Sequence, residues 1–404
     1  MAELWRPPAL RGAEHANGAP AVSWIELFYD LVFVVAIAGI GHRFIAAPGR
    51  ASAVEFVVLF GMLWWAWASL TFVVDRFESN DAIDRVLAVF QMFGVAAFAA
   101  AASREASLDA IAAPLAASYT ITRLVLIAMY ARAWWHVTES RPLVGGYLRG
   151  FGLDAALWAL SIAVPSPARY AMWAAAMAIS LATPWLMRRT QARSPLNASH
   201  LPERFGLFTI LVLGESVAAV VAGLHPDQAH ATTLAGAGAA FVVATGLWWI
   251  YFDNFEGSVV RRDPDRRHDW RPTAWIYAHF PLAACLAAAG NGMGHLITAG
   301  EAHESRALVI TCSTALAGAL LAMAVILVST AGGDVASRTR RATARAAGAL
   351  LAVAVAASGA PLTPAAYLVT LAAILLSQVL FDVTEHARAA RAARTLRAEA
   401  GVTS

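Results

Sequence analysis

The sequence has little charge, few cysteines and no lysine. Only 14% of its 404 residues are charged, and all 30 basic residues are arginine, so the net charge of +3 gives no indication of a nucleic-acid partner. The absence of lysine, together with abundant alanine, is typical of a GC-rich genome and says nothing about function. The two cysteines, Cys285 and Cys312, lie in separate apolar blocks, which excludes a disulfide framework.

The motifs of common enzymes are also missing. The chain contains no glycine-rich phosphate loop, no GxSxG nucleophile elbow and no HExxH zinc motif. Several histidines fall in loops or near span ends predicted on the outer side, but they lack the spacing of metal ligands. These are His42, His225, His230, His295 and His303. We therefore expect no enzymatic activity, no metal site and no cofactor.

What the sequence does contain is hydrophobic residues, which make up 59% of the chain. They are grouped in blocks of about twenty, the length that a helix needs to cross a bilayer. This pattern predicts an all-α polytopic membrane protein with about 12 transmembrane helices, of which 341–359 has the weakest signal. The predicted spans are 23–46, 51–74, 84–102, 110–131, 146–164, 168–187, 203–224, 231–253, 272–297, 306–329, 341–359 and 362–383.

The arginines predict how this protein is oriented. Counted over the two tails and the loops, 24 arginines fall on the side of both termini and 5 on the other side. Because positive residues accumulate in cytoplasmic loops, we expect a cytoplasmic tail at 1–20 and a basic cytoplasmic tail at 386–404. The basic tails also favour contact with membrane lipids.

Two short motifs indicate an internal duplication. Asp75-Arg76-Phe77-Glu78-Ser79 follows the second span, and Asp253-Asn254-Phe255-Glu256-Gly257 follows the eighth. Glu26 precedes the first motif by 49 residues and Glu203 precedes the second by 50. We interpret this as two six-helix halves, 21–190 and 203–385, joined by a cytoplasmic linker at 191–202. Chance recurrence of common residues is the alternative.

The duplication places charged residues at the cytoplasmic ends of several spans. A polar inner vestibule is therefore predicted, with residues that bind a proton or substrate or act as a gate. Its candidates are Glu26, Asp30, Asp75, Glu78, Glu203, Arg204, Asp253 and Glu256. Glu26 and Asp30 are one helical turn apart and repel each other, so a pair between Asp30 and an arginine such as Arg204 is favoured.

Four further ionisable residues are predicted inside the bilayer, where charge is expensive and needs a partner. Glu215 lies about 18 Å beyond Glu203 along one helix and could carry a proton or bond a neighbouring helix. Arg123 and Asp154 lie at similar depth on adjacent helices, which predicts an ion pair that stabilises the first half. His279 is a further candidate, although a histidine that bonds another helix is the more common case.

Two longer motifs resemble a known family. They are Trp24-Ile25-Glu26-Leu27-Phe28-Tyr29-Asp30-Leu31-Val32-Phe33-Val34 and the segment from His200-Leu201-Pro202-Glu203-Arg204-Phe205-Gly206 to Gly214-Glu215-Ser216. The chain is similar over residues 20–385 to the bacterial low temperature requirement A (LtrA) family. This resemblance implies a protein of the bacterial inner membrane whose family name records a growth phenotype in the cold.

Two functions from different classes fit these observations. The first is a secondary transporter or permease for an unknown small molecule or ion, with proton coupling through Glu215 and Asp30 as an option. The alternative is a membrane stress or integrity factor that acts on lipids or on a protein partner without transport. A water-accessible cavity that reaches Glu215 would favour transport. The substrate and the oligomeric state are not encoded in any motif that we identify.

Overall fold

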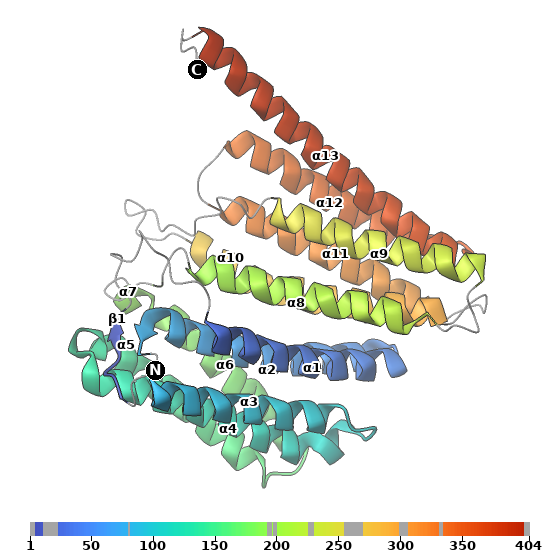
Figure 1. The fold of residues 1–404 in the computed structure, drawn as a ribbon. Helices are drawn as coiled ribbons and strands as arrows, with labels where there is room; N and C mark the ends of the chain where they lie inside the picture. The colour runs from blue at the N-terminus through green and yellow to red at the C-terminus, as the bar shows by residue number, and fades with distance from the viewer. Residues whose placement is uncertain are drawn as a thin grey trace. The chain divides into compact units, whose positions relative to one another are not determined.

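The computed structural model is built almost entirely from α-helices (Figure 1). It describes residues 5–10, 23–79, 81–191, 196, 200–224, 230–253, 270–298, 306–330 and 334–399. The helices are α1 Trp24–Ala46, α2 Arg50–Arg76, α3 Ala82–Ala102, α4 Leu108–His136, α5 Arg141–Ser161, α6 Ala168–Leu186, α7 Arg188–Gln191, α8 His200–Ala222, α9 Ala231–Phe252, α10 Arg271–Thr298, α11 Arg306–Ser329, α12 Val335–Ser358 and α13 Pro364–Glu399. A 3₁₀ helix, η2, spans Thr138–Ser140, and the strands are β1 Ala9–Leu10 and β2 Phe77–Glu78.

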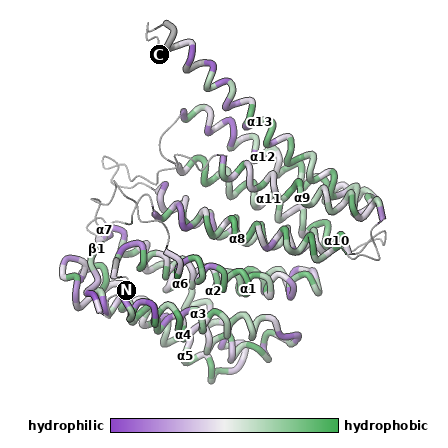
Figure 2. Tube along the Cα trace, viewed as in Figure 1, coloured by the Kyte–Doolittle hydropathy of each residue, from purple (hydrophilic) through white to green (hydrophobic). Residues whose placement is uncertain are grey.

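Each of the twelve predicted spans coincides with one long helix. Over the described residues the structure has thirteen α-helices, because the four-residue α7 follows α6. Nine of these described helices are long and apolar enough to cross a membrane; α5, α6 and α12 are not among them. Figure 2 shows hydrophobic residues along most helices and hydrophilic residues toward the C-terminal end of α13. An all-α polytopic membrane protein, as predicted, follows from these helices.

Polar side chains fix where several helices begin. Ser23 caps α1 and accepts from the backbone N–H of Glu26, whose side chain returns to Ser23 in a capping box. Asp81 caps α3 in the same way through the N–H of Asp84. Asp334 accepts from two backbone N–H groups, and α12 consequently starts six residues before the predicted 341. Its additional residues hold Arg338 and Arg340, two of the four arginines near this end of the helix.

The chain divides into two compact units, Met1–Leu211 and Val212–Ser404, with the boundary inside α8. In the first unit α3, α4, α5 and α6 pack in sequence, while α1 packs on α2 and α3. Its core is rich in aromatic residues, and Trp65, Trp67 and Trp158 are each 0% exposed. The tryptophans of α2 are therefore helix-packing residues.

The second unit is packed through small residues. In this unit α10, α11 and α12 pack in sequence, and α9 packs on α13. A Cβ atom at Gly290 would collide with Ser216, and one at Gly294 would collide with the Ala219 backbone, so these glycines allow α8 and α10 to touch. The hydroxyl of Ser216 donates to the Leu286 carbonyl across this contact at 3.1 Å. Close packing of small residues is the usual way in which membrane helices associate.

Candidate functional site

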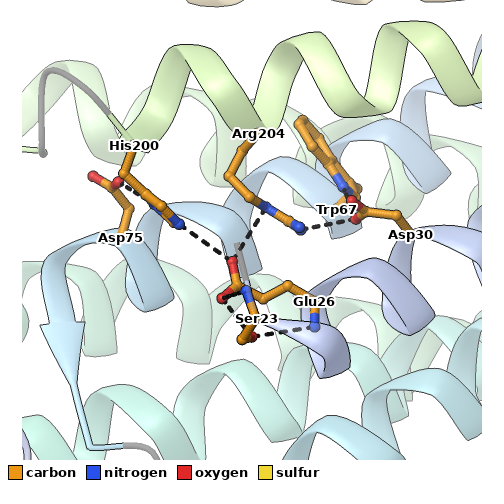
Figure 3. A network of polar contacts seen from close by, with 7 residues as sticks. All are labelled: Ser23, Glu26, Asp30, Trp67, Asp75, His200 and Arg204. Carbon is orange, nitrogen blue, oxygen red and sulfur yellow. Dashed lines mark hydrogen bonds and ion pairs between the residues drawn. The ribbon is translucent and has the colours of Figure 1, made fainter. Parts of the chain in front are cut away.

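Two helices of the first unit present matching pairs of charged residues. Glu26 and Asp30 lie one turn apart near the start of α1, and His200 and Arg204 lie one turn apart at the start of α8. Residues at i and i+4 share one face of a helix, so the carboxylates of α1 meet the basic groups of α8 in register. Figure 3 shows these four side chains pointing toward one another, with Trp67 and Asp75 beside them.

Arg204 holds both carboxylates of α1. Its Nη2 atom lies 2.8 Å from Oδ1 of Asp30, and its Nε atom lies 3.4 Å from Oε2 of Glu26. The indole N–H of Trp67 also donates to Oδ1 of Asp30 at 2.8 Å. Asp30 is 0% exposed and Arg204 is 2% exposed, so both charges are removed from bulk water. The predicted pairing of Asp30 with Arg204 is what the structure contains.

His200 connects a third helix to the same group. Its Nδ1 atom lies 2.9 Å from Oδ1 of Asp75 on α2, and its Nε2 atom lies 3.5 Å from Oε2 of Glu26. We call Glu26, Asp30, Asp75, His200 and Arg204 the ionic cluster. It contains three carboxylates, one guanidinium and one imidazole. Because the carboxylates outnumber the guanidinium, the net charge of the ionic cluster is negative unless protons bind to it.

His200 lies in the second long motif but is not among the predicted site residues. The spacing of His200 and Arg204, which equals that of Glu26 and Asp30, is the signal that could have identified it.

Beside the ionic cluster lies a cavity of about 200 Å³ in the first unit. Apolar side chains from α2 form one part of its wall, including Leu70, Val73 and Val74. Its polar lining consists of Ser23, Glu26, Tyr29, Thr71, Ser79, Asp84, Arg85, Arg132, His200 and Arg204. The cavity can therefore hold a small molecule in contact with charges of both signs.

The N-terminal residues 5–10, which we call the strap, close part of this cavity. β1 pairs antiparallel with β2, with Ala9 opposite Glu78 and Leu10 opposite Phe77. Arg132 donates to the Arg6 carbonyl at 2.7 Å, and the Arg6 backbone N–H donates to Asp81 at 2.8 Å. Pro8 of the strap is one of the cavity-lining residues. A segment expected to be a polar tail thus contributes to the wall of the site.

Arg132 also binds Asp81 and Asp84 directly. Burial opposes the charge on Asp81, but the hydrogen bonds from Arg132 and from the backbone of Arg6 and Asp84 outweigh it and lower the pKa of Asp81. A lowered pKa in the folded state means that this bond stabilises the fold above the ordinary pKa of aspartate. The stabilisation is lost as the pH falls through the lowered value.

A second polar group lies deeper in the first unit. Nη1 of Arg123 on α4 is 3.9 Å from Oδ2 of Asp154 on α5, and both side chains are 0% exposed. Ser180 donates to Asp154 at 3.1 Å, while Arg123 donates to Ser69 at 3.1 Å. The structure therefore brings the two predicted partners together, although at the long end of ion-pair distances.

The other predicted residues do not join the ionic cluster. Glu203 is exposed on α8 beside Arg204. Glu215 belongs to the second unit, is partly exposed and is not among the residues that line the cavity. Asp253 lies 3.0 Å from His386 of α13. The side chain of Glu78 and the whole of Glu256 lie outside the described residues.

His279 is a hydrogen-bonded helix partner in the second unit. Its Nδ1 atom is 2.7 Å from the Trp275 carbonyl, and its Nε2 atom is 3.0 Å from the Tyr251 hydroxyl. A carbonyl only accepts, so Nδ1 carries the hydrogen and Nε2 accepts from Tyr251 of α9. His279 is 2% exposed, and this arrangement matches the more common structural role.

Long apolar helices that bury ionic residues against one another define a multi-pass α-helical membrane protein. The model of the family "Bacterial low temperature requirement A protein (LtrA)" matches residues 21–380, and the chain belongs to this family. The resemblance expected from the two long motifs is therefore confirmed.

One curated relative is the uncharacterized protein RA0937 of Rhizobium meliloti (strain 1021). It is 23% identical over 281 residues, which cover 64% of this chain and 66% of that protein. No solved structure matches the chain.

Proposed function

We propose that this protein is a secondary transporter whose solute site is the cavity of the first unit and whose proton site is the ionic cluster. The observation that carries the proposal is the contact between the two: Glu26, His200 and Arg204 belong to the ionic cluster and also line the cavity. A solute in the cavity and a proton on the ionic cluster would therefore act on the same side chains, which is the condition for coupling.

The ionic cluster is suited to respond to a proton. It joins α1, α2 and α8 through ion pairs. Protonation of one of its carboxylates therefore weakens ion pairs between helices and does not merely remove a charge from the surface. Asp30 is the central candidate because its Oδ1 atom receives bonds from both Arg204 and Trp67. Loss of its charge would release Arg204 toward Glu26, which is a discrete change of helix contacts.

The cavity changes which residue we assign to coupling. A cavity that reaches Glu215 was the expected sign of transport, but the lining residues of this cavity include Glu26 and not Glu215. We therefore place the coupling at the ionic cluster, with Asp30 first, and assign no role to Glu215. No enzymatic step forms part of the proposed function.

The proposed topology has twelve spans, with both termini in the cytoplasm of a bacterial cell and the protein in its inner membrane. Support comes from α5 and α12, whose 21 and 24 residues are long enough to cross a bilayer of about 30 Å despite their arginines. Reporter fusions at the two ends test the orientation.

We further propose that the helices form two six-helix halves. Support comes from the packing order: consecutive helices from α3 to α6 pack on one another in the first unit, and consecutive helices from α10 to α13 do so in the second.

Transport is tested by reconstitution in liposomes that contain a pH-sensitive dye, with a panel of small ions, sugars and amino acids outside. We expect at least one solute to drive proton movement, and Asp30→Asn to remove most of it. Glu203→Gln is the matched control, because it makes the same chemical change on the exposed face of α8 and should leave the flux intact. No flux with any solute, or equal flux in wild type and Asp30→Asn, would overturn the proposal.

The alternative is a non-transporting membrane stress or integrity factor that acts on lipids or a protein partner. The second unit favours it, because Arg345 and Asp382 are both 0% exposed and bond directly to each other. Such a closed pair fits a structural role. A protein that carries no solute in the liposome assay but restores growth in the cold to a strain lacking it would support this function instead.

A further inference from the structure

The interior of the first unit contains buried polar atoms that have no hydrogen-bond partner among the described residues. They include the Tyr29 hydroxyl, the Thr71 hydroxyl, both amide atoms of Gln91, Nε and Nη1 of Arg123, Oδ1 of Asp154 and the indole nitrogen of Trp158. Tyr29, Thr71, Gln91, Arg123 and Asp154 are each at most 3% exposed. They come from α1, α2, α3, α4 and α5, so the feature belongs to the whole helix bundle and not to one helix.

The five helices that carry these atoms pack on one another. Tyr29 and Thr71 line the cavity. The side chain of Tyr29 lies near that of Gln91 on α3 and within electrostatic range of Arg123 on α4. Arg123 in turn faces Asp154, which accepts a hydrogen bond from Ser180. The polar groups therefore extend from the cavity to the Arg123–Asp154 pair near the middle of α4 and α5.

Such a series of atoms is unfavourable unless something bonds to it. A buried polar group without a partner destabilises a protein by about 1–3 kcal/mol, and buried polar groups in native proteins are satisfied by protein atoms or by ordered water. Apolar ligands offer no hydrogen bonds. Water, which both donates and accepts, matches a series that contains hydroxyls, an amide, a guanidinium and a carboxylate.

We propose that a hydrated polar path leads from the cavity past Tyr29 and Gln91 to Asp154, and that Asp154 is a second proton-binding site. A proton that enters from the cavity passes along hydrogen-bonded water and protonates Asp154, and the carboxylate becomes a neutral carboxylic acid with no other reactant. Arg123 then keeps its bond to Ser69 and its position 4.7 Å from the Tyr119 ring. The groups that face Asp154 are thus Arg123 and Tyr119 of α4, Trp158 of α5 and Ser180 of α6.

The second unit supplies an internal control. Asp382 is as buried as Asp154, but it bonds directly to Arg345, which also bonds to Gln378 at 3.0 Å. Arg345 and Asp382 are not among the residues that line the cavity of the first unit. Asp382 should therefore keep its charge and exchange no proton with water under conditions in which Asp154 does.

Infrared spectroscopy of the purified full-length protein tests the path directly. A protonated carboxylic acid has a carbonyl band that shifts when its proton is replaced by deuterium. We expect a band that appears at acidic pH, shifts rapidly after transfer to D₂O, and is absent from Asp154→Asn but present in Asp382→Asn. If Asp154→Asn does not fold, Asp154→Glu provides the assignment, because it moves the band to another frequency.

The path itself is tested by Gln91→Leu, which keeps the size of the side chain and removes its polar atoms. The deuterium shift should slow by about tenfold, the rate factor for loss of about one hydrogen bond. Phe90→Leu changes the neighbouring, 55% exposed residue and should leave the rate unchanged. Absence of an Asp154-dependent band, or equal exchange in Gln91→Leu and wild type, would overturn the inference.

The coupling role of this path rests on the proposed transport function, but the measurement does not require transport. Deuterium exchange at Asp154 that depends on Gln91 in a protein without solute flux would retain the path and refute the transporter. Solute-driven proton flux without an Asp154 band would retain the transporter and refute the path.

Discussion

Arg123–Asp154 in the first unit and Arg345–Asp382 in the second are both completely buried, yet their surroundings differ. The first pair is separated by 3.9 Å and lies at the end of a series of polar atoms without partners. The second is in direct contact and is joined by Gln378, whose amide occupies the space that the missing side chain of Gly348 leaves, although Nε of Arg345 also has no hydrogen-bond partner among the described residues. A charge pair in direct contact needs no water, whereas two groups 3.9 Å apart can still form hydrogen bonds to water. The comparison teaches that burial alone does not separate a structural ion pair from a functional one.

The largest effect should come from breaking the two pairs in the same way. Arg345→Leu leaves Asp382 without its guanidinium in a closed environment and should lower stability by about 3–5 kcal/mol. Arg123→Leu should cost less than about half of this, because water from the path can solvate Asp154. Chemical unfolding in detergent measures both. Equal losses would remove the distinction between the pairs.

Arg204→Leu tests whether the ionic cluster behaves like the directly bonded Arg345–Asp382 pair or like the more widely separated Arg123–Asp154 pair. Asp30 loses its arginine but keeps the hydrogen bond of Trp67, so a loss of about 3 kcal/mol is expected. Glu203→Ala changes the exposed neighbour and should stay within about 0.5 kcal/mol of wild type. A loss below about 1 kcal/mol for Arg204→Leu would mean that water already shares the charge of Asp30.

Trp67→Phe also tests how the charge of Asp30 is stabilised, with a smaller change to the protein. The phenyl ring retains the packing of Trp67 on Phe205 and Phe208 but cannot donate to Asp30. Removal of one hydrogen bond to a charged group should lower stability by about 2 kcal/mol. A thermal unfolding series with Trp248→Phe as the control, since this residue is 44% exposed, separates the hydrogen bond from loss of aromatic area.

The smallest effect concerns the packing of the second unit. Gly290→Ala forces the contact with Ser216 apart and should cost about 1–2 kcal/mol. Gly238→Ala meets no atom within 4 Å and should be neutral or stabilise α9 by about 0.5 kcal/mol. If both variants unfold at the same denaturant concentration, the close approach of α8 and α10 contributes little to this unit.

The helices were predictable because their signal is local. A run of about twenty apolar residues indicates a membrane helix whatever the rest of the chain does, and nine of the twelve predicted spans coincide with described helices that are long and apolar enough to cross a membrane. The ends were less predictable. α13 continues to Glu399, well past the predicted 383, because its alanines and arginines favour helix even where they no longer favour the membrane.

The candidate site was predictable only in part, because its geometry depends on residues far apart in the chain. Charge balance indicated an arginine for Asp30, and Arg204 lies 174 residues away. Nothing in the pattern pointed from His200 to Asp75, which are 125 residues apart. The strap was not foreseen, since a polar segment before the first span looks the same whether it is free or bound. The roles of these residues in transport stay predictions.

The position of the strap has a practical consequence for anyone who produces this protein. The strap lies before residue 21, where the match to the family begins, but Arg6 and Pro8 contact the site. An affinity tag attached to the strap adds foreign residues to a segment that lines the cavity and would alter binding measurements. Arg391 and Arg394 near the end of α13 are exposed, so the C-terminus is the better place for a purification handle.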